Sequence, residues 1–122
     1  SGVFDCGVCS YANAIKEKLL GVRHETLEQF GAVSPQTAAE MAKGVRRISG
    51  ADIGVSTTGI AGPQGGTPEK PVGLVYIGID SDVMTTVVET RLSRGYPEER
   101  EMIRYLASSR ALHLALQAAR MF

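Results

Sequence analysis

The sequence predicts an α/β fold, specifically a three-layer α/β/α sandwich with a mixed β-sheet. Two observations lead to this prediction. Short apolar or β-branched runs alternate with segments of helical pattern along the chain. In addition, two of the strand-like runs are separated by only a short turn, which makes them an antiparallel hairpin. No repeat or linker divides the 122 residues, so we expect one domain over residues 1–122.

The predicted elements are, in order, a strand over residues 3–11, helices over about 13–20, 25–30 and 35–49, strands over about 52–58, 72–79 and 83–92, and a helix over about 98–121. Helix boundaries carry the clearest signals. Ser34 offers an N-cap hydroxyl, and Pro35 is suited to the first helical position. Gly21, Gly31 and Gly50 each follow a helical segment, where glycine can adopt the left-handed conformation that ends a helix.

The second half predicts the hairpin and the final helix. Residues 80–82 (Asp-Ser-Asp) form a turn between two strands, the second of which is rich in β-branched residues. The last helix places apolar residues near one face, namely Ile103, Leu106, Leu114, Ala118 and Met121.

The composition limits the partners that the protein can have. Hydrophobic residues make up 43% and charged residues 21%, which is typical of a folded soluble domain. Lys plus Arg number 13 and Asp plus Glu also number 13, so no overall basic field favours nucleic acid as the main partner. No apolar run is long enough to span a bilayer, and the first residues do not resemble a signal peptide. A cytoplasmic location is expected, and the missing initiator Met indicates processing, cleavage or preparation as a fragment.

Cysteine and histidine do not predict a metal site. Cys6 and Cys9 form a lone C-x-x-C, and residues three apart on a strand point to opposite faces. A structural zinc site requires four ligands, and only His24 and His113 could add to the two cysteines. We expect free thiols, an exposed His24 in a polar run, a His113 that packs on the last helix, and no metal.

A glycine- and proline-rich loop is the most informative segment. Residues 59–71 contain four glycines and three prolines and follow a predicted strand. Glycines let backbone N–H groups approach a ligand, so the loop suits a phosphate or a developing oxyanion. It contains neither the Gly-Lys-Ser/Thr of a P-loop nor a dinucleotide fingerprint. A binding or catalytic loop and a purely structural Ω-loop both remain open on these grounds.

The stretch T-G-I-A-G-P-Q-G-G-T-P-E-K-P-V-G, over residues 58–73, resembles the signature of the CinA C-terminal domain family. Three further segments are similar to that family's motifs: Tyr11-Ala12-Asn13 with Lys16 and Leu19-Leu20-Gly21-Val22, then Gly31-Ala32-Val33-Ser34, and Arg100 with Ile103-Arg104. The resemblance covers almost the whole chain. Ala12 departs from it, since the family usually has serine there.

The resemblance implies an amidohydrolase that converts nicotinamide mononucleotide to nicotinic acid mononucleotide and ammonia without a metal or cofactor. Carried over by position, the implied catalytic residues are Tyr11, Lys16 and Thr58. The implied substrate-binding residues are Asn13, Gly59, Gly62, Gly65, Gly66, Thr67 and Arg100. The first turn of a helix disfavours an ammonium, which makes a neutral Lys16 plausible as the base that activates a serine.

The nucleophile itself has no counterpart. Family domains carry a first strand and helix with an E-S-C-T-G-G motif before the point that matches Ser1, and its serine is the presumed nucleophile. No Ser-x-x-Lys spacing occurs, and Ser10, Ser34 and Ser56 are poor substitutes. We therefore expect an N-terminally incomplete domain that associates with itself or retains the missing piece. The alternative function is a non-catalytic nucleotide-binding or protein-interaction module of the competence or DNA-damage type.

Overall fold

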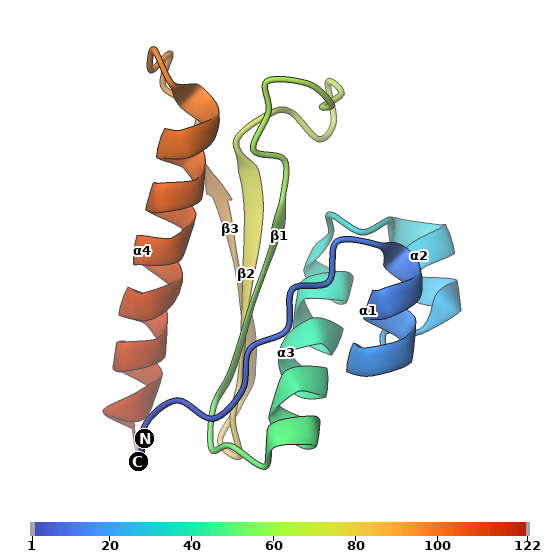
Figure 1. The fold of residues 1–122 in the computed structure, drawn as a ribbon, viewed down its shortest axis with the longest axis vertical. Coiled ribbons are helices and arrows are strands. Elements are labelled where there is room, and N and C mark those ends of the chain that lie inside the picture. Colours follow the sequence, from blue (N-terminus) through green and yellow to red (C-terminus); the bar gives the residue numbers. More distant parts are fainter. Residues whose placement is uncertain (1, 122) are drawn as a thin grey trace.

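The computed structural model describes residues 2–121. Its elements are α1 (Asn13–Leu20), α2 (His24–Phe30), α3 (Pro35–Ser49), β1 (Gly54–Gly59), β2 (Leu74–Asp80), β3 (Thr85–Arg91) and α4 (Glu99–Ala119). Figure 1 shows α4 on one side of the sheet and α3 on the other, with α1 and α2 packed on the far side of α3. The α/β class predicted from the sequence is confirmed.

The three strands form an antiparallel sheet in the order β1-β2-β3. Thr58 of β1 faces Tyr76 of β2, and Ile77 of β2 faces Val88 of β3. The predicted hairpin is β2–β3, while the glycine-rich loop joins β1 to β2. Within residues 2–121 every strand pairing is antiparallel, so the mixed sheet expected from the sequence is not found in that part of the chain.

The strand predicted over residues 3–11 is absent from the structure, and this prediction is wrong. The segment is extended coil that runs past the open edge of β1 and leads into α1 (Figure 1). Its apolar pattern suited a strand, but a strand also needs a neighbour with which to exchange backbone hydrogen bonds. β1 pairs with β2 alone, so a groove, rather than a ladder, separates β1 from residues 3–11.

The ends of α1 and α3 agree with the local signals in the sequence, whereas Gly31 ends α2 with φ of 82° and ψ of 172°, outside the left-handed helical conformation. Ser34 Oγ accepts a hydrogen bond from Thr37 N at 3.1 Å, and Pro35 is the first helical residue of α3. Gly21 and Gly50 have φ of +68° and +72°, the left-handed conformation that ends a helix.

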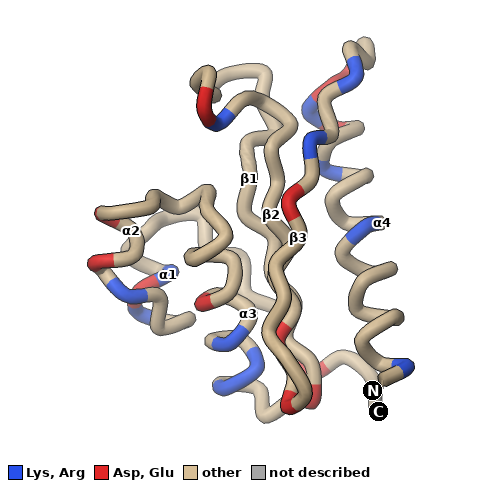
Figure 2. The backbone as a smooth tube through the Cα atoms, turned by 180° about the vertical axis from the view of Figure 1, so that it is seen from behind, with Lys and Arg blue, Asp and Glu red and all other residues tan. Residues whose placement is uncertain are grey.

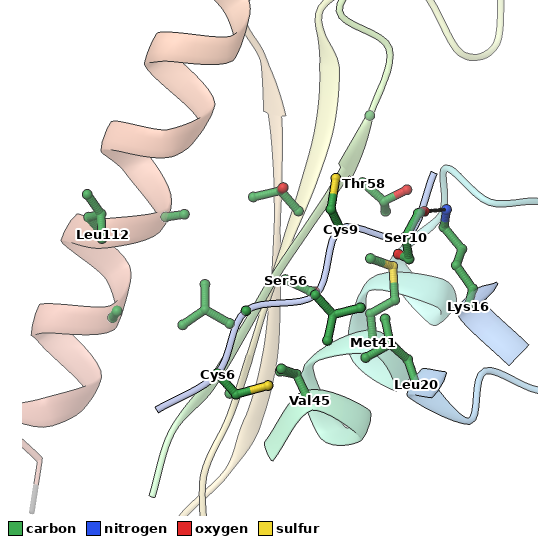
Figure 3. A pocket seen from close by; sticks show the side chains of 18 of the residues that line it. Cys6, Cys9, Ser10, Lys16, Leu20, Met41, Val45, Ser56, Thr58 and Leu112 are labelled. Carbon is green, nitrogen blue, oxygen red and sulfur yellow. Dashed lines mark hydrogen bonds between the residues drawn. The ribbon is translucent and has the colours of Figure 1, made fainter. Parts of the chain in front are cut away.

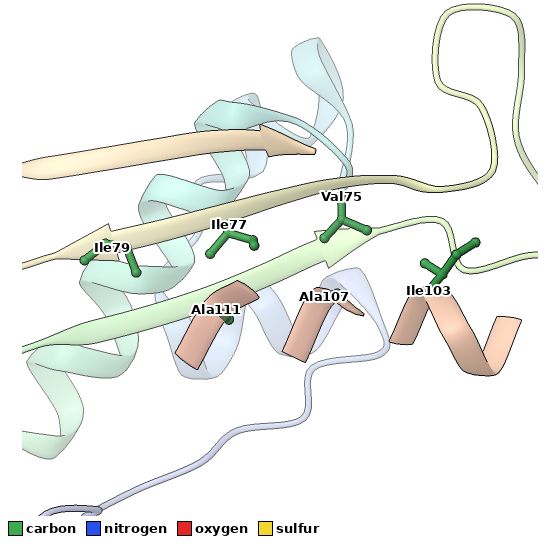
Figure 4. Close-up of a cluster of buried hydrophobic side chains, with 6 residues drawn as sticks. All are labelled: Val75, Ile77, Ile79, Ile103, Ala107 and Ala111. Carbon is green, nitrogen blue, oxygen red and sulfur yellow. The ribbon is translucent and has the colours of Figure 1, made fainter. Parts of the chain in front are cut away.

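Two apolar clusters form the core. The first packs β2 against α4 and contains Val75, Ile77, Ile79, Ile103, Ala107 and Ala111 (Figure 4). The second joins the three N-terminal helices through Leu20, Val22, Leu27 and Met41. Part of the helix α4 presents large apolar side chains to solvent: Tyr105, Leu112 and Leu116 are 68%, 73% and 50% exposed.

Charged residues of both signs are distributed along the chain, on helices, strands and connections (Figure 2). At one end of α3, Arg46 Nη1 lies 3.3 Å from Asp80 Oδ2 and Arg46 also pairs with Asp82. Thr85 Oγ1 donates to the other Asp80 oxygen at 2.5 Å. This cluster ties the β2–β3 turn to α3.

Replacing Gly44 by alanine tests the contact between α1 and α3. A Cβ at Gly44 would lie 1.9 Å from the carbonyl oxygen of Leu20, which is backbone and has little freedom to move. We expect Gly44→Ala to lower the free energy of unfolding by about 1–3 kcal/mol, as overpacking does. Urea denaturation measures this, with Lys43→Ala on the exposed face of α3 as the control. Equal stability of the two variants would contradict the packing.

Candidate functional site

A groove of about 1040 Å³ lies beside the open edge of β1. Residues 3–11 form one wall, and α3, β1, the start of the glycine-rich loop and one face of α4 form the others. This volume is at the upper end of the range of small-molecule sites. Figure 3 labels side chains from residues 3–11, α1, α3, β1 and α4 around this space.

Among residues 2–121, Lys16 is the one lysine that lines this groove. It lies in the first turn of α1, and its side chain is only 6% exposed. Nζ donates to the carbonyl oxygen of Ser10 at 2.5 Å (Figure 3). Burial lowers the pKa of Lys16 from its ordinary value, and the charge on Cys9 when it ionises partly offsets this. A lysine in this setting is closer to the neutral amine that a general base requires.

Thr58 lies near the end of β1 with its side chain buried at 7% exposure. Its hydroxyl donates to the carbonyl oxygen of Ala32, in the α2–α3 connection, at 2.6 Å. Because the hydroxyl proton is used in this bond, the Thr58 oxygen is left as an acceptor toward the groove.

Tyr11 also lines the groove, but its side chain is 94% exposed. The Lys16 amine donates to Ser10 rather than to Tyr11. Tyr11 therefore shares the groove with Lys16, but the two side chains form no hydrogen bond with each other.

The loop after β1 is compact. Gly62 and Gly66 have φ of +77° and +83°, and a Cβ at either position would come within 3.0 Å of Val72. Arg100 Nη1, from the first turn of α4, donates to the carbonyl oxygen of Gly62 at 2.7 Å. One predicted substrate-binding residue thus holds the loop that contains others.

The structure separates the predicted site residues into two groups. Around the groove it brings together Tyr11, Lys16, Thr58, Gly59, Gly62 and Arg100. It places Asn13, Gly65, Gly66 and Thr67 outside the residues that line the groove. Asn13 is exposed at the start of α1, and the other three form the distal part of the loop.

The polar groove residues that sequence reasoning did not assign to the site include Cys9, Gln64 and the backbone of Ser10. Cys9 and Ser10 adjoin Tyr11, and Gln64 is the variable position of the loop motif, so proximity to a motif was the only signal. Of the serines considered as nucleophiles, Ser34 caps α3 and Ser56 Oγ donates to Ala38 O at 2.6 Å.

The described histidines and cysteines do not form a metal site. Over residues 2–121 no group of three His, Cys, Asp or Glu side chains is placed to hold a metal ion. Cys6 and Cys9 are free thiols. His24 is exposed between Glu17 and Glu28, whereas His113, expected to pack, is exposed on α4 because α4 contacts the sheet through another face. Among the helices that the structure describes, none has the length and apolarity to cross a membrane.

These features define an α/β domain with a groove along the open edge of β1, a buried lysine on one wall and the start of a glycine-rich loop at its mouth. The model of the CinA C-terminal domain matches residues 1–119, and the chain belongs to this family.

Relatives and solved structures agree with this assignment. A putative competence-damage inducible protein of Thermoanaerobacter pseudethanolicus is 58% identical over 93 residues, 76% of this chain and 22% of that protein. A CinA-like protein of Kosmotoga olearia is 50% identical over 118 residues, 97% of this chain and 28% of that protein. The chain therefore spans about a quarter of the length of these curated relatives.

Two solved structures share the fold. The competence/damage inducible protein CihA of Agrobacterium tumefaciens superposes with a TM-score of 0.81 at 42% identity, covering 88% of this chain and 64% of that one. A CinA superfamily protein of Escherichia coli superposes with a TM-score of 0.81 at 30% identity, covering 89% of this chain and 61% of that one.

The burial of Lys16 predicts a gain in stability when the charge is removed. The pKa of Lys16 is lower in the folded state than in the unfolded chain, where it is 10.5. At a pH between the folded and the unfolded pKa, the unfolded chain binds more protons, so the free energy of unfolding rises with pH in that range. We expect Lys16→Met to stabilise the fold by about 1 kcal/mol at neutral pH, with the gain shrinking toward pH 10.5. Urea denaturation at several pH values measures this, with the exposed Lys18→Met as control. A loss of stability in Lys16→Met alone would show that the bond to Ser10 outweighs desolvation.

Proposed function

We propose that this chain forms the larger part of an amidohydrolase domain that converts nicotinamide mononucleotide to nicotinic acid mononucleotide and ammonia. The observation that carries the proposal is the buried Lys16, with its lowered pKa, in one groove with Tyr11 and Thr58. These are the three residues that resemblance to the CinA C-terminal domain implied for catalysis.

Lys16 serves as the general base in this reaction. A serine hydroxyl attacks the amide carbonyl carbon while its proton passes to the Lys16 amine, because a hydroxyl is a weak nucleophile until a base removes the proton. The C–N bond then breaks, and ammonia leaves with a proton returned from Lys16. Water, deprotonated by the same amine, attacks the acyl-serine ester. The ester C–O bond breaks, the acid is released, and the serine oxygen takes the proton back from Lys16. Tyr11 assists by relaying the proton or stabilising the neutral lysine.

The serine comes from a segment outside this chain. The groove next to β1 has room for it, and the matched part of the Agrobacterium tumefaciens protein is only 64% of that chain. A strand in the groove would take up the free edge of β1 and give residues 3–11 a partner. The result is the mixed sheet of a three-layer sandwich that the sequence predicted.

The nucleotide is bound by the mouth of the groove. Within the loop from Gly59 to Thr67, the N–H groups of Ile60 and Thr67 donate to Leu74 O and Lys70 O. The backbone N–H groups between Ala61 and Gly66 suit the phosphate or the developing oxyanion. Arg100 has N–H groups beyond the one that holds Gly62 O, and these are available for an anion. The Thr58 oxygen accepts from a polar hydrogen of the substrate. A small nucleotide, rather than nucleic acid or a membrane, is the partner in this proposal, in a cytoplasmic protein that is able to self-associate.

One observation favours a second candidate, a non-catalytic nucleotide-binding module. Ser34 and Ser56 both have hydroxyls engaged in other hydrogen bonds, so neither faces Lys16 as a free nucleophile. The relatives' names refer to competence and damage induction rather than to an enzymatic reaction. Under this reading the groove binds a nucleotide and leaves it unchanged.

Ammonia release from nicotinamide mononucleotide distinguishes the two candidates. The 122-residue chain is compared with a form extended by the E-S-C-T-G-G segment. We expect activity only in the extended form, with at least a hundredfold loss in Lys16→Ala, consistent with removal of a general base that contributes roughly 10²–10⁴-fold. Lys18→Ala should retain full activity, because Lys18 is an exposed lysine two residues after Lys16 on α1.

Other outcomes point elsewhere. Binding of the nucleotide without ammonia release in either form would support the binding module. Neither binding nor release would contradict both candidates. Activity in the short chain would show that a residue of this chain is the nucleophile, and Ser10 would be tested first because it adjoins Lys16 in the groove.

A further inference from the structure

Lys70, at the far end of the glycine-rich loop, reaches across to another layer of the molecule. Its Nζ donates to the carbonyl oxygen of Phe30 at 2.6 Å. Phe30 is the last residue of α2, where helix carbonyls lack an intrahelical partner and the helix dipole favours a cation. The lysine therefore satisfies a group that the helix itself leaves open.

The connection that receives Lys70 also holds the catalytic candidate Thr58. Ala32 O accepts the Thr58 hydroxyl at 2.6 Å, only two residues from Phe30. Between them, Gly31 O accepts the hydroxyls of Ser34 at 3.0 Å and Thr37 at 2.7 Å. The α2–α3 connection is thus anchored to the start of α3. Its carbonyl groups accept hydrogen bonds from Thr58, near the end of β1, and from Lys70, at the far end of the loop.

Space at Gly31 is matched to the lysine. A Cβ added there would lie 3.0 Å from Lys70 Nζ, and Gly31 has a φ of +82°. Only glycine adopts this conformation readily and leaves room for the ammonium.

The backbone of Lys70 also closes the distal turn of the loop. Thr67 N donates to Lys70 O at 2.8 Å, and Lys70 N donates to Thr67 Oγ1 at 3.0 Å. From the opposite side of the sheet, Arg100 holds Gly62 O at 2.7 Å. The loop is therefore held from both sides, by α4 near its start and by α2 near its end.

We propose that Lys70 is a positioning residue that keeps the glycine-rich loop oriented toward the groove. It lies outside the residues that line the groove, so it acts through the loop and not on the substrate. The inference rests on the proposed function, in which loop amides bind the nucleotide. Loosening the loop weakens ground state and transition state alike, so it raises KM and leaves kcat nearly unchanged.

The test compares Lys70→Met with Lys70→Arg, which retains a donor for Phe30 O, and with Lys43→Met on the exposed face of α3 as control. In the extended, active form we expect Lys70→Met to raise KM for nicotinamide mononucleotide about tenfold, as loss of a charge-assisted hydrogen bond does, with kcat within about twofold. Lys70→Arg should restore most of the affinity. In the 122-residue chain, hydrogen exchange of residues 60–73 should be faster in Lys70→Met than in Lys43→Met.

Two outcomes would overturn the inference. One is an unchanged KM together with unchanged exchange in the loop. The other is a lower melting temperature with unchanged KM, which would make Lys70 a structural residue only. If the extended form shows no activity on the nucleotide, the proposed function fails separately. The exchange measurement then decides alone: faster exchange confined to residues 60–73 supports positioning, and equal exchange rejects it.

Discussion

The close approach of α3 to the sheet is the constraint on which the rest of the structure depends. Gly54 and Gly78 leave no room for a side chain, because a Cβ would lie 2.1 Å from Ala42 O and 2.4 Å from Ala38 O, respectively. Ser56 Oγ closes the same contact by donating to Ala38 O at 2.6 Å. With α3 seated this closely, Gly44 brings α1 against it in turn. The position of Lys16 thus follows from a stack of backbone contacts that begins at the sheet.

The groove depends on these backbone contacts, but the buried Lys16 in its wall lowers the stability of the fold. Lys16 is a buried amine whose charged form costs free energy, and it lies beside the apolar cluster that joins the three N-terminal helices. The loop has no helix or strand of its own, and its shape relies on Arg100 and Lys70 donating to backbone carbonyls. Two charged side chains, Arg100 and Lys70, thus hold the loop, and in the proposed function a third, Lys16, supplies the base.

Much of the fold was predictable because its signals are local. Ser34 with Pro35 located the start of α3, and Gly50 its end, since capping depends only on neighbouring residues. The β2–β3 hairpin followed from a short turn. The strand over residues 3–11 was wrong because pairing depends on a neighbour, which no local pattern reveals. His113 was wrong for a related reason: which face of α4 meets the sheet is decided by the packing partner.

The sequence by itself determined the α/β class, the helix boundaries, the glycine-rich loop and, through motif resemblance, a group of candidate site residues. Only the tertiary structure decided which of those residues share a groove: Lys16 and Thr58 are 42 positions apart in the chain, yet both line it. It also showed that Lys70 contacts α2, and that Gly65, Gly66 and Thr67 lie outside the groove lining. Such contacts join residues distant in sequence, and only the packing of the helices on the sheet brings them together.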